Sequence, residues 1–210
     1  MPKKASNGND RARKVLAQEA ARIIVDQGIQ DYRVAKTKAA ERLGMTTRGS
    51  LPGNPEIEHA VSEHLKLFGR ESHVDLLRVL RQAALSAMGL LAAFTPRLVG
   101  PVLHGTAAAN SAVNLHVFAD DTEQVAKALA EHSVQYRIYE RRIKSRRDRA
   151  ETFSGYRFIH DNSPIEATVF PVDGMRQAPI SPVNGKPMQR ADRQTVLDLL
   201  LGTDSESVPV

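Results

Sequence analysis

The sequence contains no cysteine and no tryptophan, and aromatic residues make up only 5% of its 210 residues. Without cysteine the chain cannot form a disulfide, supply a thiolate nucleophile or build a cysteine-based metal site. The lack of disulfides also removes the main sign of an extracellular protein, so we expect a cytoplasmic location. Hydrophobic residues at 41% and charged residues at 25% are ordinary for a globular domain.

Long apolar segments and targeting signals are missing as well. The longest apolar stretch, around residues 83–94, is shorter than a membrane span and is interrupted by Ser86. Lys3 and Lys4 are not followed by an apolar run, so we expect no signal peptide. The sequence therefore predicts a protein without a membrane partner, and it leaves the oligomeric state open.

Several widespread catalytic motifs are also absent. The chain has neither Gly-x-x-x-x-Gly-Lys-Ser/Thr nor Gly-x-Gly-x-x-Gly, which gives no support to a P-loop or a Rossmann site. It has no His-Glu-x-x-His pair, and Ser154-Gly155 lacks the Gly-x-Ser-x-Gly elbow. These absences argue against a metalloprotease and against an α/β-hydrolase nucleophile.

Charge is distributed unevenly along the chain, whose net charge is +5. Residues 1–50 carry 11 basic and 5 acidic residues, a net of +6, and residues 134–158 carry eight basic and three acidic residues, a net of +5. Residues 101–133, with one Lys and four acids, have a net charge of −3. The two basic segments make RNA or DNA a candidate partner. An ordinary solvated surface is the alternative.

Helical spacing of apolar residues dominates the first part of the chain. It predicts a helical region over residues 10–94 after a polar, disordered tail at residues 1–9. Asp31 and Asn54 are expected N-caps, and Gly28 is an expected helix stop. The two helices joined at residues 28–30 are compatible with a DNA-binding helix-turn-helix, and equally with helix packing that has no role in DNA binding.

The second part, residues 95–202, alternates strand and helix patterns. A strand leads from residue 94 to residue 103, and Gly105-Thr106 forms a small-residue turn. Further strands are predicted at about 111–119, 134–144, 152–160 and 165–170, helices at 122–132 and 192–201, an irregular loop at 171–187, and a frayed tail at 203–210. The predicted fold class is α+β, a helical N-terminal region plus a small mixed sheet.

Three segments carry a resemblance to a known family. Residues 94–103 are similar to a lead-in strand, Gly105-Thr106 is similar to a Gly-Ser element, and residues 111–117 resemble the pattern Ser-Asp-x-Asp-Leu-x-Val. Together they resemble the opening of the nucleotidyltransferase fold. Residues 165–169 resemble the later strand that brings a third carboxylate, here Glu166. The resemblance covers about residues 83–170, and the chain as a whole resembles uncharacterised bacterial nucleotidyltransferase-like proteins.

The resemblance implies a nucleotide site and a metal site. Gly105, Thr106 and Ser111 would hold the nucleotide, since backbone donors at such a turn bind phosphate oxygens. The basic run that contains Arg141 and Arg142 could hold further phosphates. In the family, carboxylates on adjacent strands bind two divalent ions, Mg²⁺ or Mn²⁺, that align and neutralise the reacting phosphoryl group.

This sequence departs from the family pattern at the metal positions. The two metal-binding aspartates fall on Ala112 and Asn114, and only Glu166 keeps a charge. Alanine offers no ligand, and asparagine offers a neutral oxygen, which binds a hard dication more weakly. Asn114 and Glu166 are thus the candidate catalytic residues of a degenerate site. The expected function is binding of a nucleotide or phosphorylated ligand, with transferase activity in doubt. The alternative is a non-catalytic module that binds nucleic acid or protein.

Neighbouring residues could provide metal ligands in place of the two aspartates of the family pattern. His116 alternates with Asn114 on one strand face, and Asp120 follows that strand. Glu166, Asp120 and His116 are therefore the candidate metal ligands. The alternative interpretation is that Asp120-Asp121 caps the next helix and that His116 is an ordinary sheet histidine.

Overall fold

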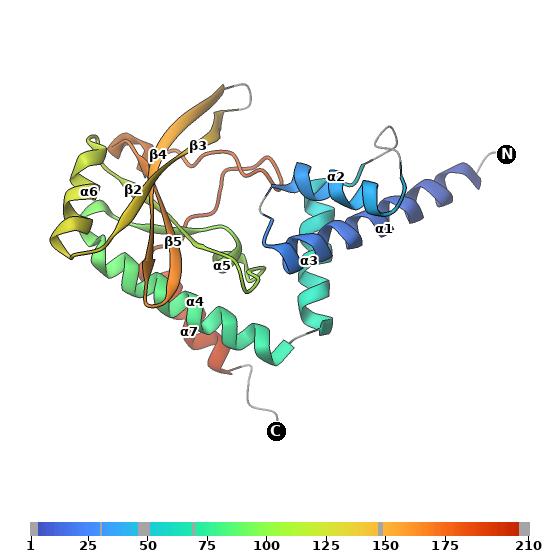
Figure 1. Ribbon diagram of the computed structural model, residues 1–210, viewed down its shortest axis with the longest axis horizontal. Coiled ribbons are helices and arrows are strands. Elements are labelled where there is room, and N and C mark those ends of the chain that lie inside the picture. The colour runs from blue at the N-terminus through green and yellow to red at the C-terminus, as the bar shows by residue number, and fades with distance from the viewer. Residues whose placement is uncertain (1–3, 30, 46–50, 69, 147–148, 206–210) are drawn as a thin grey trace. The chain divides into compact units, whose positions relative to one another are not determined.

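A computed structural model describes residues 4–29, 31–45, 51–68, 70–146 and 149–205 (Figure 1). The chain divides into two compact units. The helical unit comprises residues 1–73, 106–110 and 182–184, and the sheet unit comprises residues 74–105, 111–181 and 185–210. No helix within the described ranges is long and apolar enough to cross a bilayer.

Three helices form the helical unit: α1 (Lys4–Gln27), α2 (Tyr32–Arg42) and α3 (Asn54–Phe68). They share one apolar core to which α1 contributes Leu16 and Ile23 and α3 contributes Ile57 and Val61. Alanines fill the rest of this core on α1 and α2, so the helices can approach closely.

Local signals at Asp31 and Gly28 set two of these helix ends as expected, whereas Asn54, an expected N-cap, is the first residue of α3 and donates from Nδ2 to the Pro182 carbonyl. The Asp31 carboxylate accepts hydrogen bonds from the backbone N–H groups of Arg33 and Val34, at 2.7 and 3.3 Å, and so caps α2. Gly28, with φ +65°, ends α1. A Cβ added there would also lie 2.9 Å from Asn110 Cβ, so only glycine fits this turn.

The first helix begins earlier than the sequence indicates. Helix α1 starts at Lys4, so residues 4–9 are helical and not the disordered tail that we expect at residues 1–9. Residues 1–3 lie outside the described residues. Gly8 and its asparagine neighbours suggested a tail, but each costs a helix only about 1 kcal/mol or less. Extension from a packed helix is cheap compared with nucleation, so the turns N-terminal to Leu16 can continue it.

The boundary between the two units also differs from the expected one at residue 94. The units divide at His73 and Val74, near the start of α4 (Arg70–Leu90). Most of α4 therefore belongs to the sheet unit. Its second half buries Leu80, Met88 and the following Leu91, as the apolar character around that helix requires.

The sheet unit is a five-stranded mixed sheet with helices. Its strands are β1 (Arg97–Val99), β2 (Val113–Phe118), β3 (Tyr136–Arg146), β4 (Arg149–His160) and β5 (Ser163–Phe170). The spatial order is β1-β2-β5-β4-β3, and only β2 and β5 run parallel. The α+β class and the mixed sheet expected from the sequence are confirmed.

Helices pack against one face of this sheet. They are α4, α6 (Thr122–Glu131) and α7 (Arg193–Ser205), and Figure 1 shows α4 and α7 running beside each other. Arg81 of α4 donates to the Leu199 carbonyl of α7 at 3.2 Å. A 2.9 Å hydrogen bond joins Ser86 of α4 to His160 at the end of β4. The buried strand residues Leu98, Leu115 and Val169 belong to the core of this unit.

The segment after β1 is not the long strand expected from the sequence. β1 ends at Val99, Gly100 takes a φ of +74°, and Pro101 begins the short helix α5 (Pro101–His104). Proline suits a first helical position because it has no backbone N–H to leave unpaired. The tight turn next to the sheet is therefore at Gly100-Pro101.

Asp161 and Asn162 form a two-residue turn between β4 and β5. Their φ angles are +46° and +58°, and positive φ at both central residues defines the turn class that best matches sheet twist. The turn pairs His160 with Ser163, so β5 begins inside the predicted turn at residues 161–164. It also fixes the register of every later pair in this hairpin.

The C-terminal segments agree with the sequence in outline. The loop after β5 holds the short 3₁₀ helix η2 (Val172–Met175) and two isolated β-bridges, Ile180 with Pro187 and Ala191 with Leu98 of β1, before α7 begins at Arg193. Asp192 caps α7 by accepting from the Thr195 backbone N–H at 2.9 Å. α7 extends to Ser205, into the tail expected at residues 203–210, and residues 206–210 lie outside the described part.

Candidate functional site

The sheet face opposite α4, α6 and α7 is polar at its centre. Side chains alternate along a strand, so Asn114 and His116 of β2 share a face, away from the core residue Leu115. On the parallel neighbour β5, Glu166 pairs with Asn114 and Thr168 pairs with His116. All four polar side chains belong to residues that are buried.

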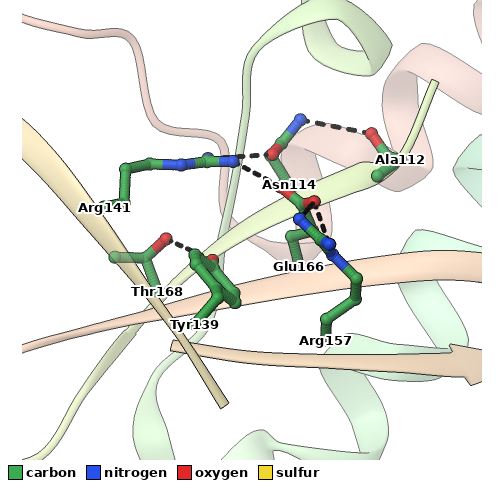
Figure 2. Close-up of polar contacts among 7 residues, drawn as sticks. All are labelled: Ala112, Asn114, Tyr139, Arg141, Arg157, Glu166 and Thr168. Atoms are coloured by element: carbon green, nitrogen blue, oxygen red, sulfur yellow. Dashed lines mark hydrogen bonds and ion pairs between the residues drawn. The ribbon is translucent and has the colours of Figure 1, made fainter. Parts of the chain in front are cut away.

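Glu166 lies between two arginines of the neighbouring hairpin (Figure 2). Arg157 of β4 donates from Nε to Glu166 Oε1 at 2.9 Å, and a second Arg157 nitrogen lies 2.6 Å from the same oxygen. Arg141 of β3 forms an ion pair with Glu166 Oε2. The Glu166 side chain is 7% exposed, whereas those of Arg141 and Arg157 are 32% and 55% exposed. One buried carboxylate thus orients two partly exposed guanidinium groups.

Tyr139 supports both arginines with its ring. The Arg141 and Arg157 guanidinium carbons lie 5.4 and 5.5 Å from the ring centroid, within the range of cation–π attraction. The phenol oxygen forms a 2.7 Å hydrogen bond with the Thr168 hydroxyl, and burial raises the Tyr139 pKa, so the phenol stays neutral. A Cβ at Gly155 would lie 2.5 Å from Tyr139 Cζ, so the ring lies over β4 only because residue 155 is glycine.

Asn114 uses both ends of its side-chain amide within the chain. Its Oδ1 accepts from Arg141 at 3.2 Å, and its Nδ2 donates to the Ala112 carbonyl at 3.2 Å. The Gly100 turn approaches it closely, because a Cβ at Gly100 would lie 3.5 Å from Asn114 Nδ2. We use the name arginine site for Asn114, Tyr139, Arg141, Arg157 and Glu166.

The structure brings together three of the residues singled out from the sequence: Asn114, Arg141 and Glu166. The contacts of Gly105 and Thr106 are with other residues. Gly105 faces Leu77 and Arg81, and the Thr106 hydroxyl donates to Glu58 Oε1 at 2.7 Å in the helical unit. The turn that approaches Asn114 is at Gly100, and the assignment of a Gly-Ser-like element to Gly105-Thr106 stays a prediction.

The other predicted nucleotide-binding residues lie outside the arginine site. Ser111 stands two residues before β2. Arg142 is exposed and pairs with Thr152 at the position after Arg141 in β3. Alternation along the strand therefore directs it to the opposite face.

The acidic pair after β2 serves the backbone. Asp120 Oδ1 accepts from the Val172 N–H at 3.0 Å at the start of η2, and Asp121 caps α6 by accepting from the Glu123 N–H at 2.9 Å. The helix-capping interpretation of Asp121 is confirmed. Asp120 accepts from the start of η2 and not from α6, the helix that the capping interpretation assigned to it.

His116 is held by an arginine from a distant part of the chain. Arg190 donates from Nε to His116 Nδ1 at 3.1 Å. Burial, with Arg190 and Arg141 nearby, lowers the His116 pKa to about 3, so the imidazole is neutral at physiological pH. Because Nδ1 accepts this bond, the ring proton lies on Nε2.

The residues at the arginine site do not fit a divalent metal ion. Ala112 offers no ligand, and Asn114 and Glu166 are both engaged by arginine. A dication placed on Glu166 would meet two guanidinium charges and only one carboxylate. Among the residues that the structure describes, no three His, Asp or Glu side chains form a group that could hold a metal ion.

Sequence reasoning missed Arg157, Tyr139, Gly100 and Arg190. Two of these had a usable signal. A two-residue Asp-Asn turn sets the hairpin register, and that register pairs Arg157 with Glu166. A Gly-Pro step directly after a predicted strand marks a tight turn, which points to Gly100. Comparison with protein-family models, with curated proteins and with solved structures finds no match.

Proposed function

We propose that the protein binds a nucleotide or another phosphorylated ligand at the arginine site, without metal-assisted transfer. The observation that supports this most directly is the arrangement of two arginines around one buried carboxylate. Their charges sum to +1 on this polar face of the sheet. The proposed site resembles that of the nucleotidyltransferase fold in its place on β2 and β5. Its positive charge would come from arginines rather than from bound metal ions.

The two guanidinium groups are suited to anions because they are preorganised. A guanidinium has five N–H donors. In the hydrogen bonds described above, Arg141 uses one nitrogen on Asn114 and one on Glu166, and Arg157 uses two nitrogens on Glu166. Donors remain on side chains that are one-third and about half exposed. Because Glu166 and Tyr139 already hold the side chains, binding a phosphate costs little additional side-chain entropy.

Nucleotide binding with and without divalent ions tests the proposal. Isothermal titration calorimetry with ATP, GTP, CTP and UTP should detect binding that does not require Mg²⁺, is at least as tight in EDTA as in Mg²⁺, and weakens as salt increases. Arg141→Gln and Arg157→Gln should each weaken binding about ten-fold or more, because a charged hydrogen bond contributes roughly 1.5–3 kcal/mol.

Arg142→Gln is the matched control, since it removes the same charge from the neighbouring position on the other strand face. It should leave affinity unchanged. Strict dependence on Mg²⁺ or Mn²⁺, or equal losses in all three variants, would contradict the proposal. Release of pyrophosphate from a nucleoside triphosphate would show transfer and would refute the non-catalytic part.

A second candidate function is nucleic-acid binding on the opposite face of the β3–β4 hairpin. Arg142 and Lys144 alternate along β3 there and are exposed. Fluorescence anisotropy with labelled RNA and DNA tests it with the same variants. Loss of binding in Arg142→Gln and Lys144→Gln, with Arg141→Gln unaffected, would favour this function over nucleotide binding.

A further inference from the structure

We infer that Arg97 and Arg190 form a phosphate subsite beside the arginine site, and that the ligand is a nucleotide with at least two phosphate groups. This inference rests on the proposed function and specifies its ligand. Arg97 lies on β1, and Arg190 comes from the loop before α7. Both belong to the sheet unit.

Arg190 is anchored by neutral groups. It donates from Nε to His116, and one terminal nitrogen donates to the Gly174 carbonyl at 2.8 Å. Its guanidinium carbon lies 5.0 Å from the Phe118 ring centroid and 5.2 Å from that of Phe170. The other terminal nitrogen is buried and has no hydrogen-bond partner among the described residues. Such a donor calls for an acceptor, because an unsatisfied buried donor is costly.

Arg97 brings a second positive charge to the same place. It pairs with His116 across β1 and β2, and it donates to the Pro96 carbonyl at 3.3 Å. Burial and the charge of Arg97 lower the Arg190 pKa to about 10, which still leaves Arg190 charged at physiological pH. The two cations therefore sit close enough to repel each other.

The Asp192 carboxylate, whose pKa is lowered by its hydrogen bonds to Thr195 and by the charge of Arg97, uses an oxygen on backbone and hydroxyl donors. Asp192 feels the charge of Arg97, but its Oδ1 accepts from the Thr195 N–H and hydroxyl at 2.9 and 2.7 Å. In the described part of the chain, neither Arg97 nor Arg190 has a carboxylate within ion-pair distance. By contrast, Glu166 partly neutralises Arg141 and Arg157. An incoming anion therefore gains more at Arg97 and Arg190.

His116 connects the subsite to the arginine site. Arg190 donates to the His116 ring, and Arg141 lies near enough to lower the His116 pKa, so the charges of both sites act on this one residue. His116 and Glu166 also belong to one face of adjacent parallel strands. Asn114 of the arginine site and His116, which binds Arg190, are two residues apart on β2, about 7 Å along the strand. A chain of two or more phosphates is long enough to span that distance, whereas a single phosphate occupies one site. This geometry favours nucleoside diphosphates and triphosphates over monophosphates.

Inorganic pyrophosphate is the direct probe of the subsite. Calorimetric titration of the full-length protein should detect pyrophosphate binding that Arg97→Gln and Arg190→Gln each weaken about ten-fold or more. The exposed Arg176, at the end of η2, provides a control of equal charge. Arg176→Gln should bind pyrophosphate like the wild-type protein. ATP and ADP should bind at least ten-fold more tightly than AMP to the wild-type protein, and Arg97→Gln should reduce this preference.

The outcomes separate the subsite from the proposed function. Pyrophosphate binding that depends on Arg97 and not on Arg141 or Arg157, in a protein that binds no nucleotide, would support the anion subsite and refute both ligand binding at the arginine site and the nucleotide assignment. Absence of pyrophosphate binding to the wild-type protein, or equal binding by wild type and Arg97→Gln, would overturn the subsite. If Arg190→Gln fails to fold, Arg97→Gln still tests the subsite. Among the hydrogen bonds described, the Arg97 side chain makes only the one to the Pro96 carbonyl, so its replacement should leave the fold intact.

Discussion

Replacing Glu166 with glutamine tests whether this carboxylate orients the two arginines or holds a catalytic metal ion. The substitution keeps the size of the side chain and removes its charge. Arg141 and Arg157 then lie against the Tyr139 ring without a counter-ion, since both ion pairs end on Glu166. We expect Glu166→Gln to destabilise the fold and, at the same time, to strengthen anion binding.

The size of the stability loss follows from burial. Removing one partner of a fully buried ion pair costs about 3–5 kcal/mol, and an exposed pair contributes about 1 kcal/mol or less. Glu166 is buried at 7% exposure, but its partners are 32% and 55% exposed and water screens them. We therefore expect a loss of about 2 kcal/mol. For a protein of this size that lowers Tm by roughly 4–8 °C.

The gain in anion affinity follows from Coulomb's law. With an effective dielectric constant of about 40, a carboxylate about 6 Å from a bound anion repels it by roughly 1.4 kcal/mol per unit charge. Loss of that repulsion corresponds to on the order of ten-fold tighter binding. A carboxylate that held a catalytic metal would give the opposite result, because its removal would weaken nucleotide binding in the presence of Mg²⁺.

Urea unfolding and calorimetric titration of phosphate or ATP measure both effects. Glu140→Gln is the matched control, because Glu140 is exposed and precedes Arg141 on β3. The control should change neither quantity by more than the error of the measurement. Unchanged stability in Glu166→Gln, or weaker anion binding together with metal dependence, would refute the interpretation of Glu166 as the residue that orients the two arginines.

Three further predictions concern the folding of the two units and the buried histidine. Leu115→Ala, at a fully buried position of β2, should lower the free energy of unfolding by about 2–5 kcal/mol in urea titration, and a loss below 1 kcal/mol would contradict its place in the core. Asp31→Ala should cost about 1 kcal/mol through loss of the α2 cap, and Asp31→Asn should restore most of it, as followed by circular dichroism. The folded-state pKa of His116 is about 3, below the value of about 6.5 expected in the unfolded chain. Stability from this group is therefore present above pH 6.5 and is lost as pH falls toward 3, by about 2 kcal/mol between pH 7 and pH 5. His116→Gln should lose this part of the pH dependence, and an identical pH profile in the variant would contradict the neutral, buried state of the ring.

The elements of this fold were predictable because their signals are local. Asp31 caps α2, Gly28 ends α1 and Asp121 caps α6, and each acts within a few residues of its own position. Errors arose where a nonlocal effect decided the outcome. Helix α1 extends to Lys4 despite Gly8, and α4 belongs to the sheet unit although its sequence continues a run of helices.

The candidate site was only partly predictable because it depends on strand order. The sequence indicated Asn114 and Glu166 as partners through the family resemblance, and β2 and β5 do pair them. The hairpin turn could have added Arg157. Arg190 could not be found in this way, because its contact with His116 joins residues 74 positions apart through a loop without regular structure. No periodicity in the sequence encodes that contact.

One electrostatic argument connects the two arginines with the presence of alanine and asparagine, rather than aspartate, at positions 112 and 114. In the family pattern, three carboxylates would meet on β2 and β5, and their mutual repulsion would require bound cations. With Ala112 and Asn114 in place of two of them, a single carboxylate remains, and Arg141 and Arg157 already provide more than its balancing charge. Restoring aspartate at position 114 alone would add a carboxylate where Asn114 now accepts from Arg141. It would pair with the arginine before it attracted a metal ion. Binding of a divalent metal ion at this site would therefore require removal of Arg141 and Arg157 as well as addition of aspartates, and Asn114→Asp by itself should bind phosphate more weakly without binding Mg²⁺.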